Sequence, residues 1–452
     1  MEPSPTPNVS AATAGTETAA GPSDSGPLLN RNFVLLWIGQ SISQLGSQAY
    51  NLAMMFWLME KTGSASLMGL VLTCANLPAL LLSPLGGTFA DRHSRIRILI
   101  VCDLLAGCSL LGLASAVWLV PGNVRFLIGC LFMVSTSLGL IQAFFMPAVT
   151  ASIPDLVPRD KLTGANSLNQ LSVQAALFVG QAAGGVLYRL VGAPVLFLID
   201  GLSYFCSAVS AMFIRPPQRT QERKPAKSAR EAFREFLDEL KDGFRYVWKL
   251  KGFRYFVAAT SLMNFLLMPV VVLFPFFVRL YLGKGAAWYG FLMAAVSIGT
   301  VCGFLLASVL RLQGPPRAWA VIAGMLMVPL LYGTLSFLRA PAAALTGAFG
   351  VGAALGFANV TLLTMAQLST PPEMRGRVMG LVATLTGGLI PFGMALGGFV
   401  GDLTGKNIPL VYGVCGALTV TVILSTCLRP ETREYLAWGR LGRPEELAES
   451  PI

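Results

Sequence analysis

The sequence predicts an all-α polytopic membrane protein with twelve transmembrane helices in two pseudo-symmetric six-helix bundles. Hydrophobic residues make up 54% of the 452 residues, charged residues only 12%, and the mean hydropathy is +0.65. These values are far from those of an ordinary soluble chain. The apolar residues fall into runs long enough to cross a bilayer as helices, which takes about 20 residues each. One long polar stretch, 215–252, separates the first six runs from the last six.

Each apolar run is read as a helix because lipid offers no partner for backbone polar groups, and the runs are too long and too uniformly apolar for barrel strands. In chain order the expected membrane helices are 33–59, 65–89, 97–120, 124–150, 164–190, 194–214, 253–280, 287–311, 317–338, 342–368, 376–402 and 408–428.

These helices define five segments. We expect a disordered cytoplasmic tail over 1–30, an N-terminal bundle over 31–214, a cytoplasmic linker over 215–252, a C-terminal bundle over 253–428 and a cytoplasmic tail over 429–452. The first tail is rich in Ser, Thr, Pro, Ala and Gly and lacks the charged start and apolar core of a secretory signal. In the linker, apolar residues recur at helical spacing among charged ones from Phe233 to Trp248. This amphipathic helix either lies on the inner leaflet or packs against the bundle ends.

The basic residues predict the orientation. Most lysines and arginines lie in the tails and in the connections after even-numbered helices; the other side holds only Lys61, Arg125, Arg189, Arg279, Lys284, Arg339 and Lys406. The positive-inside rule then places both termini in the cytoplasm. We expect a multi-pass protein of the bacterial inner (plasma) membrane. The basic loops that give the chain its net charge of +11 face the anionic inner leaflet, so this charge does not indicate a nucleic acid partner.

Nothing in the sequence indicates catalysis. All eight cysteines lie within or at the ends of apolar runs, where cysteine behaves as a small hydrophobe, and no metal-ligand spacing occurs. The sequence also lacks a nucleophile–base set and a nucleotide-binding loop. We therefore expect neither an enzyme nor a cofactor nor a metal, and an ion gradient rather than ATP as the energy source.

The connection after the second helix carries the most specific motif, G-G-T-F-A-D-R-H-S-R-I-R, with Gly87, Asp91, Arg92 and Arg95 as its key residues. It resembles the G-x-x-x-D-R-x-x-R-[RK] loop of the major facilitator superfamily, with Ile96 where a second basic residue is usual. The stretches 144–148, 153–158, 162–168, 273–279 and 372–380 resemble the branch that contains enterobactin exporters and macrolide efflux proteins.

This resemblance implies a gating role. In the superfamily the aspartate and arginines of this loop latch helix 2 to the other bundle in the outward-facing state, so Asp91, Arg92 and Arg95 are the expected latch. A carboxylate gains from the macrodipole at a helix N-terminus, here that of the eleventh helix near Arg375. The alternative is an ordinary topology signal of positive residues, although orientation alone requires no aspartate.

Two glycine pairs indicate an internal duplication. Gly184–Gly185 in the fifth helix and Gly397–Gly398 in the eleventh are separated by a constant offset of 213 residues. The first pair closes the stretch G-Q-A-A-G-G (180–185), which resembles the antiporter motif G-P-x-x-G-G with Gln181 in place of proline. The glycines serve either this motif or simple close packing of helices.

Amides predict the substrate cavity. Gln40, Gln44 and Gln48 fall on one face of the first helix, within an arc of about 80°. The superfamily resemblance implies that helices 1, 4, 7 and 10 line a central cavity. The candidates are therefore Gln40, Gln44, Gln48, Gln142, Asn264, Asn359 and Gln367. Any of them can instead join helices, a bond worth about 0.6 kcal/mol on average.

Asp103 and Asp200 are the two carboxylates well inside apolar runs. An intramembrane acid is by default a functional candidate, so both are candidates for proton coupling. The alternative is a structural ion pair, between Asp103 and an arginine of the loop motif and between Asp200 and Arg189.

The sequence therefore predicts a monomeric secondary transporter that exports an amphipathic small molecule, such as an antibiotic, a siderophore or another natural product, in antiport with protons. The expected partners are the small-molecule substrate, protons and the lipid bilayer. An uptake symporter for a polar nutrient and a non-transporting membrane sensor are the alternatives.

Overall fold

The computed structural model describes residues 27–215, 229–371 and 374–437, and this part of the chain consists of helices joined by short connections, without a β-strand. The all-α fold class is thus confirmed. The predicted tails and linker lie partly outside the described residues. The helices are α1 (Arg31–Thr62), α2 (Ala65–Arg92), α3 (Arg95–Leu119), α4 (Val124–Leu156), α5 (Leu162–Ala175), α6 (Gln181–Met212), α7 (Ala229–Lys249), α8 (Lys251–Phe276), α9 (Ala286–Leu310), α10 (Gly314–Leu335), α11 (Pro341–Leu368), α12 (Arg375–Gly388), α13 (Ile390–Leu403), α14 (Ile408–Cys427) and α15 (Pro430–Ala437).

Ten helical stretches in the described part are long and apolar enough to cross a membrane. One of them, Leu162–Met212, contains two helices, because Gly192 interrupts α6 with a φ of 77° that a non-glycine residue rarely adopts. The 32-residue α1 is not among the ten, since its amides and serines make it less apolar than the others. The twelve-helix count stays a prediction.

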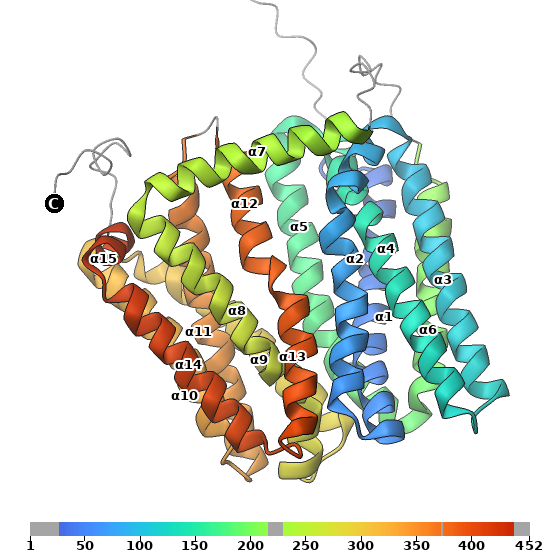
Figure 1. Cartoon of the computed structure of the whole chain (residues 1–452). Helices are drawn as coiled ribbons and strands as arrows, with labels where there is room; N and C mark the ends of the chain where they lie inside the picture. Colours follow the sequence, from blue (N-terminus) through green and yellow to red (C-terminus); the bar gives the residue numbers. More distant parts are fainter. Residues whose placement is uncertain (1–26, 216–228, 372–373, 438–452) are drawn as a thin grey trace, which may run out of the picture.

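The helices form two groups, seen in Figure 1 as blue to green (α1–α6) and yellow to red (α8–α14). In the first group α1 packs on α6, and α2 and α3 pack on α4; in the second α9 packs on α11, and α13 and α14 pack on α8. The groups meet mainly where α2 contacts α13 and where α6 contacts α9. The predicted domain limits at 31–214 and 253–428 stay predictions.

The linker helix α7 crosses one end of both groups (Figure 1), which we call the α7 end; the opposite end, where α1 meets α2, is the far end. Val247 of α7 is buried, and Tyr246 Oη donates a hydrogen bond to the carbonyl of Ser369 at 2.8 Å. Arg377 Nη1 lies 3.4 Å from Asp242 Oδ2. These contacts support packing of α7 against the helix ends. The side chains of its predicted apolar residues Phe233, Phe236, Leu237 and Leu240 lie outside the described residues.

The connections between helices are short and locally satisfied. Gly63 ends α1 in the left-handed region (φ 62°), and the side chain of the next residue, Ser64, accepts the backbone N–H of Leu67 as the N-cap of α2. Large apolar side chains on the flanks are exposed, among them Leu119 (80%) and Val309 (76%). Such a surface suits lipid rather than water.

Candidate functional site

The predicted latch residues lie at the α7 end. Asp91 and Arg92 belong to the last turn of α2, and Arg95 is the first residue of α3. The Asp91 side chain is 75% exposed, and its Oδ1 lies 3.8 Å from Arg95 Nη2. Within the described part of the chain, no hydrogen bond or ion pair joins Asp91 to α12. In this conformation Asp91 is therefore not bonded to its expected partner, the N-terminus of α12.

The two arginines of the motif face inward within the first group. Arg95 Nη1 donates to Asp155 Oδ2 at 2.6 Å and to the carbonyl of Ala151 at 2.7 Å, so it joins α3 to α4. Nη2 of Arg92 is buried and has no hydrogen-bond partner among the described residues. The motif glycine Gly87 has open space around it, whereas its neighbour Gly86 lies directly against the carbonyl of Ala143 in α4. Of these two neighbours, Gly86 is thus the one that the close packing of α2 on α4 requires.

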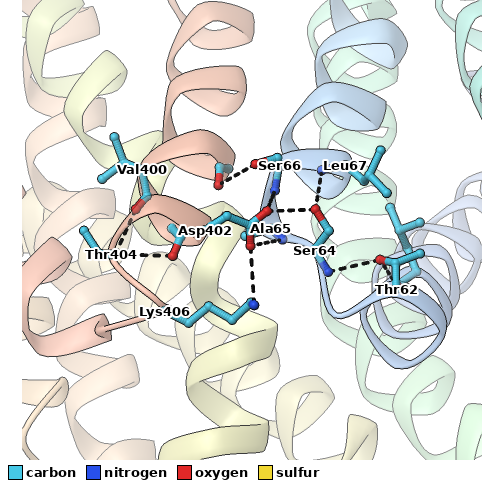
Figure 2. A network of polar contacts seen from close by, with 12 residues as sticks. Thr62, Ser64, Ala65, Ser66, Leu67, Val400, Asp402, Thr404 and Lys406 are labelled. Carbon is cyan, nitrogen blue, oxygen red and sulfur yellow. Dashed lines mark hydrogen bonds and ion pairs between the residues drawn. The ribbon is translucent and has the colours of Figure 1, made fainter.

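The far end carries a polar network that joins the two groups (Figure 2). Asp402, in the last turn of α13, accepts the backbone N–H of Ala65 on Oδ1 at 2.9 Å and that of Ser66 on Oδ2 at 2.8 Å. The Ser64 hydroxyl donates to Oδ2 at 2.8 Å, and Lys406 Nζ lies 3.4 Å from Oδ1. We call Ser64, Ala65, Ser66, Asp402 and Lys406 the Asp402 network. It places a carboxylate of one group at a helix N-terminus of the other, where the macrodipole favours an anion.

From this network α2 and α13 stay in contact toward the middle of the molecule. The Ser66 hydroxyl donates to the carbonyl of Gly398 at 3.4 Å, and the Thr73 hydroxyl donates to that of Pro391 at 2.8 Å. Gly69 lies against the carbonyl of Met394, with no room for a Cβ atom. Small residues thus allow the helices to approach closely.

The two glycine pairs make equivalent contacts. Gly184 packs on Ala49 in α1 and Gly185 on Ala286 in α9, while Gly397 packs on Pro269 in α8 and Gly398 on Ala65 in α2. In each pair the first glycine contacts its own group and the second contacts the other group. This is the symmetry that a duplication of the two halves predicts.

Gln181, which replaces the proline of the antiporter motif, follows a π-helical turn over Ala176–Gly180. Such turns interrupt the regular hydrogen-bond ladder and are frequent at functional sites. Gln181 Nε2 donates to Gln48 Oε1 in α1 at 3.1 Å, and Gln181 Oε1 is buried without a partner among the described residues. The irregular turn lies directly before the position at which the antiporter motif has its proline.

The seven predicted cavity amides divide into two sets. Three make hydrogen bonds between helices: Gln40 to the Ser207 hydroxyl (3.5 Å), Gln48 with Gln181, and Asn264 to the Thr386 carbonyl (3.0 Å). Gln44 has a buried Oε1 with no hydrogen-bond partner in the described part of the chain. Gln142, Asn359 and Gln367 are exposed. Gln44 and the exposed amides therefore keep hydrogen-bonding capacity for a ligand, and the cavity itself stays a prediction.

Both predicted coupling carboxylates are buried, Asp103 at 0% and Asp200 at 1% exposure. Oδ1 of Asp200 accepts the hydroxyls of Ser203 (3.2 Å) and Ser47 (3.4 Å), and Ser47 also bonds to the Tyr204 hydroxyl (3.0 Å). Oδ2 of Asp200 and both oxygens of Asp103 have no hydrogen-bond partner at normal distance among the described residues.

The ion pairs considered for these acids are not formed in the described part of the chain. The motif arginine Arg95 pairs with Asp155 instead of Asp103. Arg189 is exposed, and the groups that bond to Asp200 are hydroxyls. At Asp200, hydroxyl groups of α1 and α6 therefore take the place of a cation partner.

Asp402 and Asp155 are the polar residues that the sequence analysis missed. A local signal existed for Asp402, because a carboxylate in the last turn of a helix is opposed by the macrodipole of its own helix and needs an outside partner. Asp155 likewise lies in the last turn of its helix, α4, and its outside partner is Arg95, with which it forms an ion pair.

Comparisons with known proteins agree with this architecture. A family model described as transmembrane secretion effector matches residues 22–447. Macrolide efflux protein A of Streptococcus pyogenes is 24% identical over 385 residues, which covers 83% of this chain and 90% of that protein. Multidrug efflux pump Tap of Mycobacterium tuberculosis is 24% identical over 359 residues, covering 78% of this chain and 83% of that protein.

Solved structures show the same fold at low identity. A bacterial homologue of the iron transporter ferroportin in its inward-facing state superposes with a TM-score of 0.68, at 16% identity, covering 89% of this chain and 100% of that chain. The inward-open xylose transporter XylE from E. coli superposes with a TM-score of 0.66, at 14% identity, covering 92% of this chain and 99% of that chain. With a family model that spans nearly its whole length, the chain belongs to the transmembrane secretion effector family of the major facilitator superfamily, whose members are multi-pass membrane transporters rather than enzymes.

Proposed function

We propose that this protein exports an amphipathic small molecule, such as an antibiotic, a siderophore or another natural product, by alternating access in exchange for protons. One observation supports alternating access above the others. The two groups are joined at the far end by the Asp402 network, while at the α7 end Asp91 is exposed and unengaged. This is the asymmetry expected of one of the two states between which two bundles rock.

The orientation follows from charge. The α7 end carries the linker and most of the connecting lysines and arginines, so the positive-inside rule makes it cytoplasmic in the bacterial inner membrane, with both termini on that side. The described conformation is then inward-facing, and the far end faces out. Export rather than uptake rests on the relatives, which are named a macrolide efflux protein and a multidrug efflux pump.

Proton coupling is assigned to Asp103 and Asp200. Both are buried among helices of the first group, and neither has a cation partner among the described residues. An ionised carboxylate removed from water costs several kcal/mol unless it is compensated. Binding and release of a proton is a direct way to meet that cost, with the hydroxyls of Ser47, Ser203 and Tyr204 at hand to donate or accept hydrogen bonds.

Everted membrane vesicles that acidify their lumen test the proposal. Proton-driven export predicts that a radiolabelled macrolide or catecholate siderophore accumulates in the lumen and that an uncoupler abolishes the accumulation. An uptake symporter would instead accumulate a polar nutrient in intact cells and nothing in everted vesicles. A non-transporting sensor would move no solute in either preparation.

A further inference from the structure

One pair of antiparallel helices carries a carboxylate at each of its two ends. Asp91 is in the last turn of α2 at the α7 end, and Asp402 is in the last turn of α13 at the far end. α12 and α13 follow one another and run in the direction opposite to α2. Asp91 therefore lies at the end where α12 starts, at Arg375, and Asp402 lies at the end where α2 starts, at Ala65. Each carboxylate is opposed by its own helix dipole and favoured by that of the partner.

Only one of the two positions is engaged. Asp402 accepts two backbone N–H groups of α2, while Asp91 is 75% exposed and, among the described residues, has Arg95 as its charged partner. The first N–H groups of a helix have no partner within the helix itself. In α2 those of Ala65 and Ser66 bond to Asp402 and that of Leu67 bonds to Ser64. Separation of α2 from α13 would therefore leave two N–H groups and the Ser64 hydroxyl to water.

We propose that Asp402 is a gating residue, the releasable outer latch of the transport cycle, which is closed when the inner latch at Asp91 is open and open when that latch is closed. The proposal rests on alternating access. Rocking that opens the far end withdraws Asp402 from Ala65 and Ser66, and the same rotation brings the α7 ends of α2 and α12 together. One rigid-body motion therefore forms one of the two contacts and breaks the other.

Two features make this latch releasable rather than permanent. The Asp402 side chain is 29% exposed, so water reaches it when the contact opens. Lys406 is in the same half of the chain and lies 3.4 Å from the carboxylate, so it stays with Asp402 after release and compensates its charge. The partner N–H groups in α2 belong to the first turn of the helix, so water can replace Asp402 as their acceptor once the two helices separate.

The equivalent position in the other half has the opposite charge. The offset of 213 residues relates Asp402 to Arg189 in α6, which is exposed. A cation is disfavoured at a helix N-terminus, so the α6–α9 contact has no counterpart of this latch. Among the described residues, the charged contact between the groups at the outer gate therefore lies on the α2–α13 side.

Hydrogen–deuterium exchange of the full-length protein in lipid nanodiscs tests the latch directly. In Asp402→Asn, exchange at Ala65 and Ser66 should rise at least about tenfold, and exchange at residues 374–378 should fall as the α7 end closes. Asp91→Asn should give the opposite changes. The matched control is Glu60→Gln, which removes an acid at the same end whose partner, the Tyr188 hydroxyl at 2.8 Å, belongs to the same half; it should change neither region.

The outcomes separate the latch from the proposed function. If Asp402→Asn raises exchange at Ala65 and Ser66 but leaves residues 374–378 unchanged, Asp402 is a local helix cap and the reciprocal latch is wrong. If Asp402→Asn and Glu60→Gln behave alike, the latch is also wrong. Failure of alternating access itself would appear in the unmodified protein, as identical exchange at both ends with and without a transported macrolide. A thermal unfolding scan of each variant establishes that it is folded.

Discussion

Arg95 Nη1 lies 2.6 Å from Asp155 Oδ2, and this ion pair joins the start of α3 to the last turn of α4. Both side chains are largely shielded, at 20% and 30% exposure, and Arg95 also donates to the Ala151 carbonyl. A motif arginine that the family resemblance assigns to a latch between bundles is thus engaged within one bundle. It has a structural contact that a gating role alone does not require.

Arg95→Ala should therefore destabilise the protein by about 1–3 kcal/mol, the usual range for hydrogen bonds to charged groups and for a partner left unsatisfied. The measurement is the Tm in detergent. Arg97→Ala is the control, because Arg97 is exposed two residues further on. Equal Tm values for the two variants would contradict the structural role. Lost transport at unchanged Tm would point to the latch alone.

Two adjacent glycines should respond differently to alanine. A Cβ atom at Gly86 would meet the Ala143 carbonyl, whereas at Gly87 it meets nothing within 4 Å. Overpacking of this kind costs about 1–3 kcal/mol, so Gly86→Ala should lower the Tm and Gly87→Ala should not. Thermal unfolding in detergent, followed by circular dichroism, gives the Tm of both variants. The prediction fails if Gly87→Ala is the less stable protein.

The stripe of glutamines on α1 should separate into a structural and a ligand-binding residue. Gln40 is 5% exposed and bonds to Ser207, while the Gln44 carbonyl oxygen is buried without a described partner. Gln44→Leu should raise the substrate concentration for half-maximal efflux about five- to tenfold, as expected for the loss of one or two hydrogen bonds. Gln40→Leu should change that concentration less than twofold. The reverse order would show that Gln40 contacts the substrate.

The buried aspartates should affect gradient-driven transport more than substrate exchange. Asp200→Asn and Asp103→Asn keep the side-chain volume but remove the proton-binding group, so at least one should abolish uncoupler-sensitive accumulation in everted vesicles while leaving substrate counterflow within about threefold. Ser109→Ala, which removes an exposed hydroxyl of α3 that bonds to the Leu105 carbonyl of the same helix, is the control and should retain driven transport. If both aspartate variants keep uncoupler-sensitive accumulation, neither residue carries the proton.

Most of the long apolar helices could be predicted from the sequence because each is encoded by its own apolar run. The expected 65–89 and 408–428 became α2 (Ala65–Arg92) and α14 (Ile408–Cys427), within a few residues at each end. The connection expected between 190 and 194 is present as the break at Gly192. The π-helical turn at Ala176–Gly180, by contrast, has no sequence pattern that periodicity detects.

The polar contacts were harder to predict, for a physical reason. The distance between Asp402 and Ala65 along the chain is 337 residues, so only the packing of two helices brings them together. The pairing of Arg95 with Asp155 likewise depends on how α3 and α4 meet. Residue type located the buried Asp103 and Asp200, but the Ser47 hydroxyl that bonds to Asp200 comes from α1, which the sequence does not place beside α6.

The chemistry of the Asp402 network has a consequence for evolutionary analysis. Its acceptor is a side chain, whereas two of its donors are main-chain N–H groups of Ala65 and Ser66 that every residue except proline supplies. The first turn of α2 can therefore drift in sequence without breaking these bonds, while position 402 remains constrained. Covariation between homologous sequences should leave this contact almost invisible, and tolerance to proline at 65 and 66 should trace it instead.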